Sequence, residues 1–152
     1  MLRARRIAWI ALATAAVAGP GPAAALSSTS AYFRGPGGNV VCGYFAGAGQ
    51  PASLECGVPT GLDPPPPRPS ASACHDLDFA NDRVRLAATG EVIGFCSGDV
   101  GVLAELGSAP VLGYGKTWRE GPFTCTSSVA WITCKNTSGH GFALSRLRWH
   151  RF

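Results

Sequence analysis

The C-terminal stretch Tyr114–Phe152, YGKTWREGPFTCTSSVAWITCKNTSGHGFALSRLRWHRF, decides the fold. It contains two segments rich in β-branched and aromatic residues, a composition that favours strands. These segments, Thr117–Ser127 and Val129–Thr137, each carry one cysteine. The stretch therefore predicts a β-hairpin that a disulfide cross-links.

A Gly-His-Gly turn follows this hairpin and leads into Phe142–Phe152, where apolar and polar residues alternate. Alternation with a period of two is typical of a strand, and neither side of this segment is purely apolar. We therefore expect one long edge strand here, with arginine stems packed on aromatic side chains.

Two earlier parts of the chain repeat the arrangement of strands and cysteines. Residues 38–42 also faintly echo residues 121–125, each ending in a cysteine. The expected strand pairs are Asn39–Phe45 with Ala52–Val58, and Arg83–Ala88 with Glu91–Cys96. Residues 101–106 fit either a helical turn or a strand. The sequence thus predicts an all-β fold: a small disulfide-stapled antiparallel sheet or partly closed barrel built from cystine hairpins.

All six cysteines lie after residue 25, and an even number in a small exported chain predicts a disulfide framework. Six cysteines allow fifteen connectivities. We expect the sequential one, because each pair then joins one local hairpin or loop. The expected pairs are Cys42–Cys56, Cys74–Cys96 and Cys125–Cys134.

The first 25 residues have the features of a cleaved secretory signal peptide: a basic start, an apolar run and small residues before the cleavage site. We therefore expect one secreted or periplasmic domain at 26–152, with a Pro-rich crossover loop at 59–73. The leader holds three of the 13 basic residues and none of the 9 acidic ones, so the rest has a net charge of +1. That charge gives no footprint for nucleic acid.

The recognisable motifs for cofactors and metals fail on inspection. Gly113–Thr117 ends like a phosphate-binding loop, but Pro110 stands where that loop needs a glycine. The cysteines lack the paired spacing of a zinc site, and disulfides would consume them. Asn136-Thr137-Ser138 matches a glycosylation signal, which we expect to be idle. We expect no cofactor and no metal.

Two groups of residues are candidates for function. A basic and aromatic cluster near the C-terminus, with the Gly-His-Gly turn, gives a candidate binding surface of His140, Arg146, Arg148 and Trp149. The alternative is a purely structural role, in which the charges keep an edge strand from aggregating. The other group is His140 and Ser145 with an acid such as Asp76 or Asp78, which would suit a small extracytoplasmic hydrolase. No G-x-S-x-G elbow accompanies them.

Three segments resemble a family of small exported bacterial proteins of unknown function, found in actinobacteria and proteobacteria. Its outline matches Phe33–Cys42, Tyr114–Cys125 and the G-H-G-F-x-L-S-R motif at Gly139–Arg146, before a C-terminal aromatic residue. The chain departs from it at Leu62-Asp63, where a tryptophan is common, and at Trp131, where a glycine is common. The resemblance implies a secreted, cystine-stapled, mostly β domain, and no activity.

The leading hypothesis is a non-enzymatic protein that binds an envelope polymer or protein, a secreted enzyme inhibitor being one version. A hydrolase using His140 and Ser145 is the alternative, and a structural envelope component is a third. We expect a monomer that binds no nucleic acid and meets the membrane only through its signal peptide.

Overall fold

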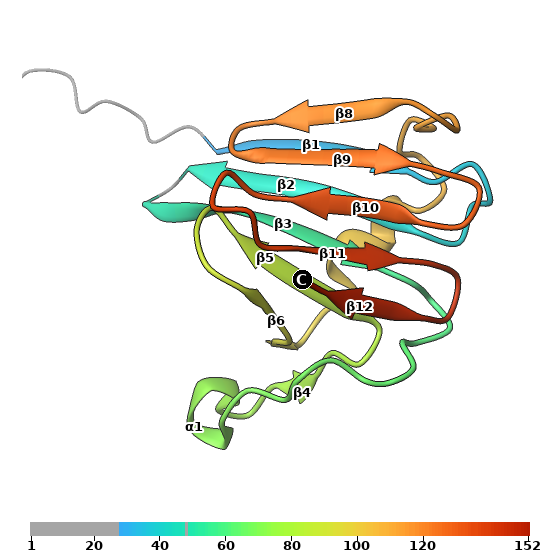
Figure 1. Cartoon of the computed structure of the whole chain (residues 1–152). Helices are drawn as coiled ribbons and strands as arrows, with labels where there is room; N and C mark the ends of the chain where they lie inside the picture. Colours follow the sequence, from blue (N-terminus) through green and yellow to red (C-terminus); the bar gives the residue numbers. More distant parts are fainter. Residues whose placement is uncertain (1–27, 48) are drawn as a thin grey trace, which may run out of the picture.

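The computed structural model describes residues 28–47 and 49–152, so the predicted leader at 1–25 lies outside the described residues. Two five-stranded antiparallel sheets pack face to face (Figure 1). The first has the order β1 (Thr29–Arg34), β2 (Val41–Gly47), β3 (Gln50–Gly57), β5 (Arg83–Ala87) and β6 (Val92–Ile93). The second has the order β8 (Thr117–Glu120), β9 (Phe123–Ser127), β10 (Ile132–Lys135), β11 (Gly141–Leu144) and β12 (Trp149–Arg151).

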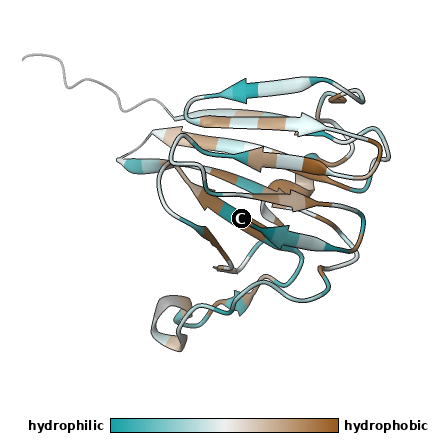
Figure 2. Ribbon diagram, in the orientation of Figure 1, coloured by the Kyte–Doolittle hydropathy of each residue, from teal (hydrophilic) through white to brown (hydrophobic). Residues whose placement is uncertain are grey.

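The all-β prediction is confirmed, but the sheets are not closed into a barrel. Each sheet has one face rich in apolar side chains, and the two faces bury each other, which is the sandwich solution for amphipathic sheets. Figure 2 shows hydrophobic and polar residues alternating along many of these strands. Smaller elements lie outside the sandwich: the helix α1 (Ala71–Cys74), the 3₁₀ helix η1 (Gly101–Glu105), and a two-stranded sheet of β4 (Asp78–Phe79) and β7 (Cys96–Ser97).

The two large sheets follow one plan. Neighbouring strands place an aromatic residue, two cysteines and an apolar residue in one row across each sheet. That row is Phe33, Cys42, Cys56 and Val84 in the first sheet, and Trp118, Cys125, Cys134 and Phe142 in the second. The faint echo between residues 38–42 and 121–125 thus falls on equivalent strands, β2 and β9.

The two cysteine pairs meet in the middle of the core. Cys42–Cys56 and Cys125–Cys134 are disulfides whose four residues are fully buried. The Sγ atoms of Cys42, Cys56 and Cys134 lie within 4.8 Å of one another, so the disulfides of the two sheets are in contact. The third disulfide joins Cys74 to Cys96, which completes the expected sequential pairing. Three disulfides indicate an oxidising, extracytoplasmic environment.

Asn136 connects the second sheet to the first. It is 4% exposed and follows β10. Its Nδ2 donates to the carbonyl oxygens of Ala87 and Gly90, each at 3.0 Å, at the β5–β6 turn of the other sheet. Its Oδ1 accepts from the Ser138 amide and hydroxyl and from the His140 amide, all at 3.1 Å. The asparagine of the glycosylation signal is therefore a buried clamp.

The two glycines of the Gly-His-Gly motif are required for different reasons. Gly139 has φ of +88°, a conformation that glycine adopts without strain. A Cβ on Gly141 would collide with the backbone carbonyl of Cys134 and would lie 2.8 Å from the Phe152 ring. Gly141 and Phe152 also exchange two backbone hydrogen bonds, both of 2.9 Å. The motif thus lets the C-terminal residue close over the start of β11.

Several strand boundaries differ from the prediction. The strand β1 is not among the strand pairs expected from the sequence. Thr117–Ser127 is a hairpin of two strands, β8 and β9, because the chain reverses at Gly121, which has φ of +50°. The single long strand at Phe142–Phe152 is also wrong: a turn at 145–148 divides it into β11 and β12. Residues 101–106, left open between helix and strand, begin with η1.

The Pro-rich segment runs along the C-terminal hairpin. The amide of Asp63 donates to the Leu147 carbonyl, and Trp149 Nε1 donates to the Pro64 carbonyl at 2.7 Å. The Asp63–Pro64 peptide bond is cis. Within the described residues, no helix is long and apolar enough to span a bilayer.

Candidate ligand-binding site

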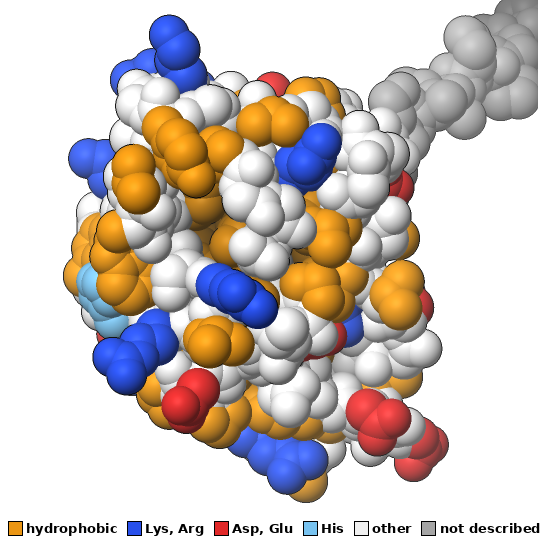
Figure 3. All heavy atoms as spheres, turned by 90° about the vertical axis from the view of Figure 1, so that its right-hand side faces the viewer, with side chains coloured by type: hydrophobic (Ala, Val, Ile, Leu, Met, Phe, Trp, Pro, Cys, Tyr) orange, Lys and Arg blue, Asp and Glu red, His pale blue; other side chains and the backbone are white. Residues whose placement is uncertain are grey.

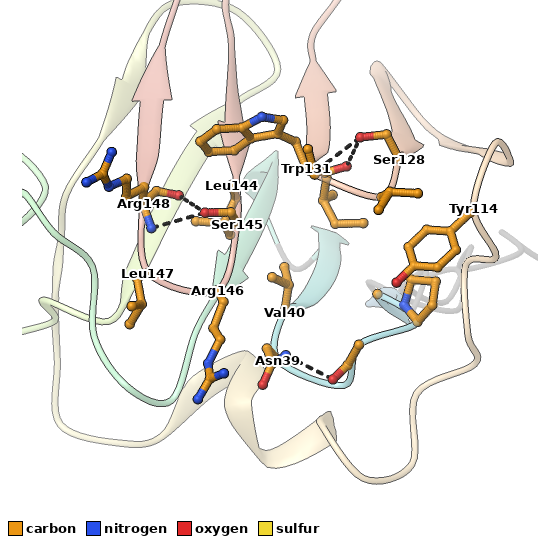
Figure 4. Close-up of a pocket in the computed structure, with 16 residues that line it drawn as sticks. Asn39, Val40, Tyr114, Ser128, Trp131, Leu144, Ser145, Arg146, Leu147 and Arg148 are labelled. Atoms are coloured by element: carbon orange, nitrogen blue, oxygen red, sulfur yellow. Dashed lines mark hydrogen bonds between the residues drawn. The ribbon is translucent and has the colours of Figure 1, made fainter.

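Three turns converge at one end of the sandwich and surround a pocket of about 410 Å³. They are the β1–β2 turn (35–40), the β9–β10 turn (128–131) and the β11–β12 turn (145–148), with Tyr114 beside them (Figure 4). Antiparallel hairpins bring these turns to the same end, because β2, β10 and β12 all begin there. We call this pocket and its three turns the loop end.

Two of the turns are built in the same way. In the β9–β10 turn, Ser128 Oγ donates to the Trp131 carbonyl and accepts from the Trp131 amide, both at 3.0 Å. In the β11–β12 turn, Ser145 Oγ donates to the Arg148 carbonyl at 2.9 Å and accepts from the Arg148 amide at 3.1 Å. A backbone hydrogen bond of 2.8 Å closes each turn as well. Each serine therefore fixes a turn whose two central residues project outward.

The floor of the pocket is apolar and its rim is cationic. Val40, Ile132 and Leu144 line the pocket and are buried in the core between the sheets. Two exposed arginines, Arg146 and Arg148, line the rim, and none of the described lining residues is acidic. Figure 4 shows Arg146 extending toward Asn39 in the β1–β2 turn, while the Arg148 guanidinium points away from the centre of the pocket.

Neither rim arginine has a salt-bridge partner among the residues that the structure describes. The described ion pairs involve other arginines, at positions 83, 85 and 151. The loop end is therefore a positively charged site with an apolar floor. Such a site suits a ligand that carries an anionic group beside an apolar part.

The structure brings together only part of the predicted binding surface. Arg146 and Arg148 share the loop end, whereas His140 precedes β11 at the opposite end of that strand. Trp149 is 8% exposed and belongs to the core. Its ring packs inside and its Nε1 is used by Pro64, so a surface ligand does not reach it.

The residues of the hydrolase hypothesis do not converge. His140 and Ser145 flank the four-residue strand β11, and a strand of that length spans roughly 13 Å. Ser145 Oγ uses its hydrogen and a lone pair on Arg148. Asp78 lies in β4, outside both large sheets, and Asp76 precedes it. None of these three candidate partners, His140, Asp76 and Asp78, is thus placed by the described elements to activate this hydroxyl.

A second groove crosses the outer face of the first sheet, with a volume of about 680 Å³. Glu55 and Arg85 belong to its lining. Glu55 is 5% exposed, and its carboxylate accepts from Arg83 Nη1 at 3.3 Å, Arg85 Nη2 at 3.4 Å and the Val102 amide at 3.2 Å. The Arg85 guanidinium also lies 4.0 Å from the centre of the Phe95 ring.

These charged groups hold the fold together at that groove. Arg83 is 4% exposed and also donates to Asp82 Oδ1 and to the Asp99 carbonyl, both at 2.9 Å. The bond from Val102 fixes η1 onto β3, because Glu55 is part of that strand. Glu55 and Arg85 are paired with each other, and Asp99, the remaining charged residue of the lining, is acidic. Among the described residues, this groove therefore offers no free positive charge to a ligand, whereas the loop end offers two arginines.

The model of a family of unknown function, DUF6636, matches residues 11–152. The chain belongs to this family. No curated protein and no solved structure matches the chain. Membership in DUF6636 brings no activity with it, so the function rests on the site.

Sequence reasoning missed three residues of the loop end in this DUF6636 chain: Ser128, Trp131 and Tyr114. A signal was present, since Ser-x-x-Trp at 128–131 and Ser-x-x-Arg at 145–148 have equivalent spacing. A serine that caps a tight turn commonly bonds a backbone group a few residues away. Trp131 also packs edge-on against His150, with ring centroids 5.3 Å apart, which braces the neighbouring turns.

Proposed function

We propose that this protein is a non-enzymatic, extracytoplasmic binding module of the bacterial envelope, and that it holds an anionic ligand at the loop end. One observation carries the proposal: two exposed arginines border a pocket whose described lining includes no acidic residue. Unpaired guanidinium groups are strong donors to carboxylate and phosphate oxygens. Export to the envelope fits the three disulfides.

The construction of the site supports binding over catalysis. Its hydroxyls at Ser128 and Ser145 are engaged in holding the turns. The turns are thereby set before a ligand arrives, which lowers the entropy that binding has to overcome. The same serine that the hydrolase hypothesis needs as a nucleophile has a sufficient structural role.

The test measures co-sedimentation of the oxidised protein with isolated bacterial envelopes. The double variant R146A/R148A removes the two rim charges, and R119A/K135A is the matched control. Arg119 and Lys135 are exposed, lie on β8 and β10, and do not line the pocket. A positive charge near an anionic surface contributes about 1 kcal/mol, so losing two of them weakens binding by about thirtyfold.

The control variant should bind nearly as well as the unchanged protein. Equal weakening in both double variants would mean that net charge alone governs binding. Unchanged binding of R146A/R148A would refute the loop end as the site.

A further inference from the structure

Large apolar side chains stand around the rim of the loop end. Val129 is 84% exposed, Tyr114 is 52% exposed and Leu147 is 51% exposed, and all three line the pocket. Val111, which is 51% exposed, forms a bridge with Arg34 just before the β1–β2 turn. Figure 3 shows this end of the molecule, where hydrophobic side chains form separate patches with lysine or arginine side chains between them.

Two of these side chains, Val129 and Leu147, lie at the tips of the two serine turns. Val129 and Ala130 are the central residues of the first turn, and Arg146 and Leu147 are those of the second. The hydroxyl of Thr60 also donates to the Arg146 carbonyl at 3.2 Å. These hydrogen bonds therefore hold each tip in place. Exposing an apolar side chain to water does not stabilise the domain, so the position of Val129 and Leu147 is not explained by folding.

We infer that the loop end docks on a bilayer that contains anionic phospholipid. This inference rests on the proposed function and names its ligand. The apolar tips enter the boundary between headgroups and acyl chains, where burial of Val129 and Leu147 is favourable. Arg146 and Arg148 stay at the headgroup level and donate to lipid phosphate oxygens. The apolar floor of Val40, Ile132 and Leu144 faces the same side.

The arrangement of the tips favours a bilayer over a protein partner. A stable protein interface of standard size buries about 800 Å² of well-matched surface on each side. At the loop end the apolar groups sit on separate turns, with a hollow between them. A fluid bilayer adapts to separate tips. Contact with lipid would replace the expectation that the chain meets the membrane only through its signal peptide.

The test uses vesicles of phosphatidylcholine with about 30% phosphatidylglycerol, compared with phosphatidylcholine alone. Oxidised protein should co-sediment with the anionic vesicles and about tenfold less with the neutral ones, and high salt should weaken the binding. The variant V129S/L147S should lose about tenfold in affinity, because it removes apolar tips. The control L77S/I93S changes two other exposed apolar residues, 50% and 49% exposed, that do not line the pocket.

Equal loss in L77S/I93S and V129S/L147S would overturn the inference, and so would equal binding to both kinds of vesicle. Competition with soluble glycerol phosphate separates the headgroup from the bilayer: full displacement at low concentration would also overturn it. Lipid-extracted cell walls separate the two proposals. Binding to those walls without binding to vesicles would refute the bilayer and leave the anion-binding function standing. Binding to neither would refute both.

Discussion

Replacing Asn136 by alanine should destabilise the protein by about 3 kcal/mol, because its side chain joins the two sheets. The change deprives the Ala87 and Gly90 carbonyls and the Ser138 and His140 amides of their partner. A lost hydrogen bond of this kind costs about 1 kcal/mol, and the exposed Gly90 and Ser138 regain part of that from water. The free energy of unfolding of a typical domain is roughly 5–15 kcal/mol, so a loss of about 3 kcal/mol is a large share of it.

The conservative change Asn136→Asp tells the two halves of the clamp apart. It keeps an acceptor for the turn but places a carboxylate oxygen against two carbonyl oxygens, so it should cost at least about 2 kcal/mol. The assay is equilibrium unfolding in guanidinium chloride with the disulfides intact, followed by tryptophan fluorescence. The control is Thr137→Ala, at the exposed residue next to Asn136, which should change the free energy of unfolding by less than about 0.5 kcal/mol. A loss below about 1 kcal/mol for Asn136→Ala would refute the clamp.

Three further predictions concern the packing. Glu55→Gln should lower the free energy of unfolding by about 3 kcal/mol, since it leaves Arg83 buried with a weaker partner. Hydrogen exchange at the Val102 amide should become faster, because the bond that holds η1 on β3 is weakened. Unchanged exchange would contradict this link between Glu55 and η1. Gly141→Ala should lower the melting temperature by more than about 10 °C, because the added Cβ has no room. Gly107→Ala, at a position with open space around it, should leave the melting temperature nearly unchanged. Equal effects of the two changes would disprove the packing argument. Denatured, non-reduced protein should show no free thiol in a titration, and detection of even one would contradict the three disulfides.

The local structure of this chain was largely readable from its sequence. Each disulfide joins a cysteine to the next cysteine along the chain, so local hairpins and loops implied the sequential pairing. Strands β2, β3 and β5 lie within about two residues of their predicted positions, because alternation and β-branched residues mark them. The all-β class follows from the same pattern.

What the sequence did not reveal depends on contacts between distant segments. Alternation shows that a strand has an apolar face but not what covers that face, so one sheet and two facing sheets were indistinguishable. The turn at 145–148 was missed because Arg146 and Arg148 continue the alternation of β11, and only the Ser145 hydroxyl marks the reversal. The buried Glu55 was unreadable, since its partners come from β5 and η1.

The loop end was found only in part for the same reason. Its arginines were visible as a cluster near the C-terminus, but the β1–β2 and β9–β10 turns reach it from far along the chain. Trp149 entered the predicted surface because an aromatic residue between basic ones suggests exposure. In the structure the alternation of β12 turns its ring into the core.

Hydroxyl-radical footprinting of the oxidised protein on isolated envelopes tests the central claim most directly, because it needs no knowledge of the ligand. The account predicts that labelling falls at Tyr114, Val129 and Leu147 when the protein is bound, and that Tyr32 and Phe45 in the groove on the first sheet keep their labelling. Protection of Tyr32 and Phe45 with unchanged labelling at the three loop-end residues would contradict the account.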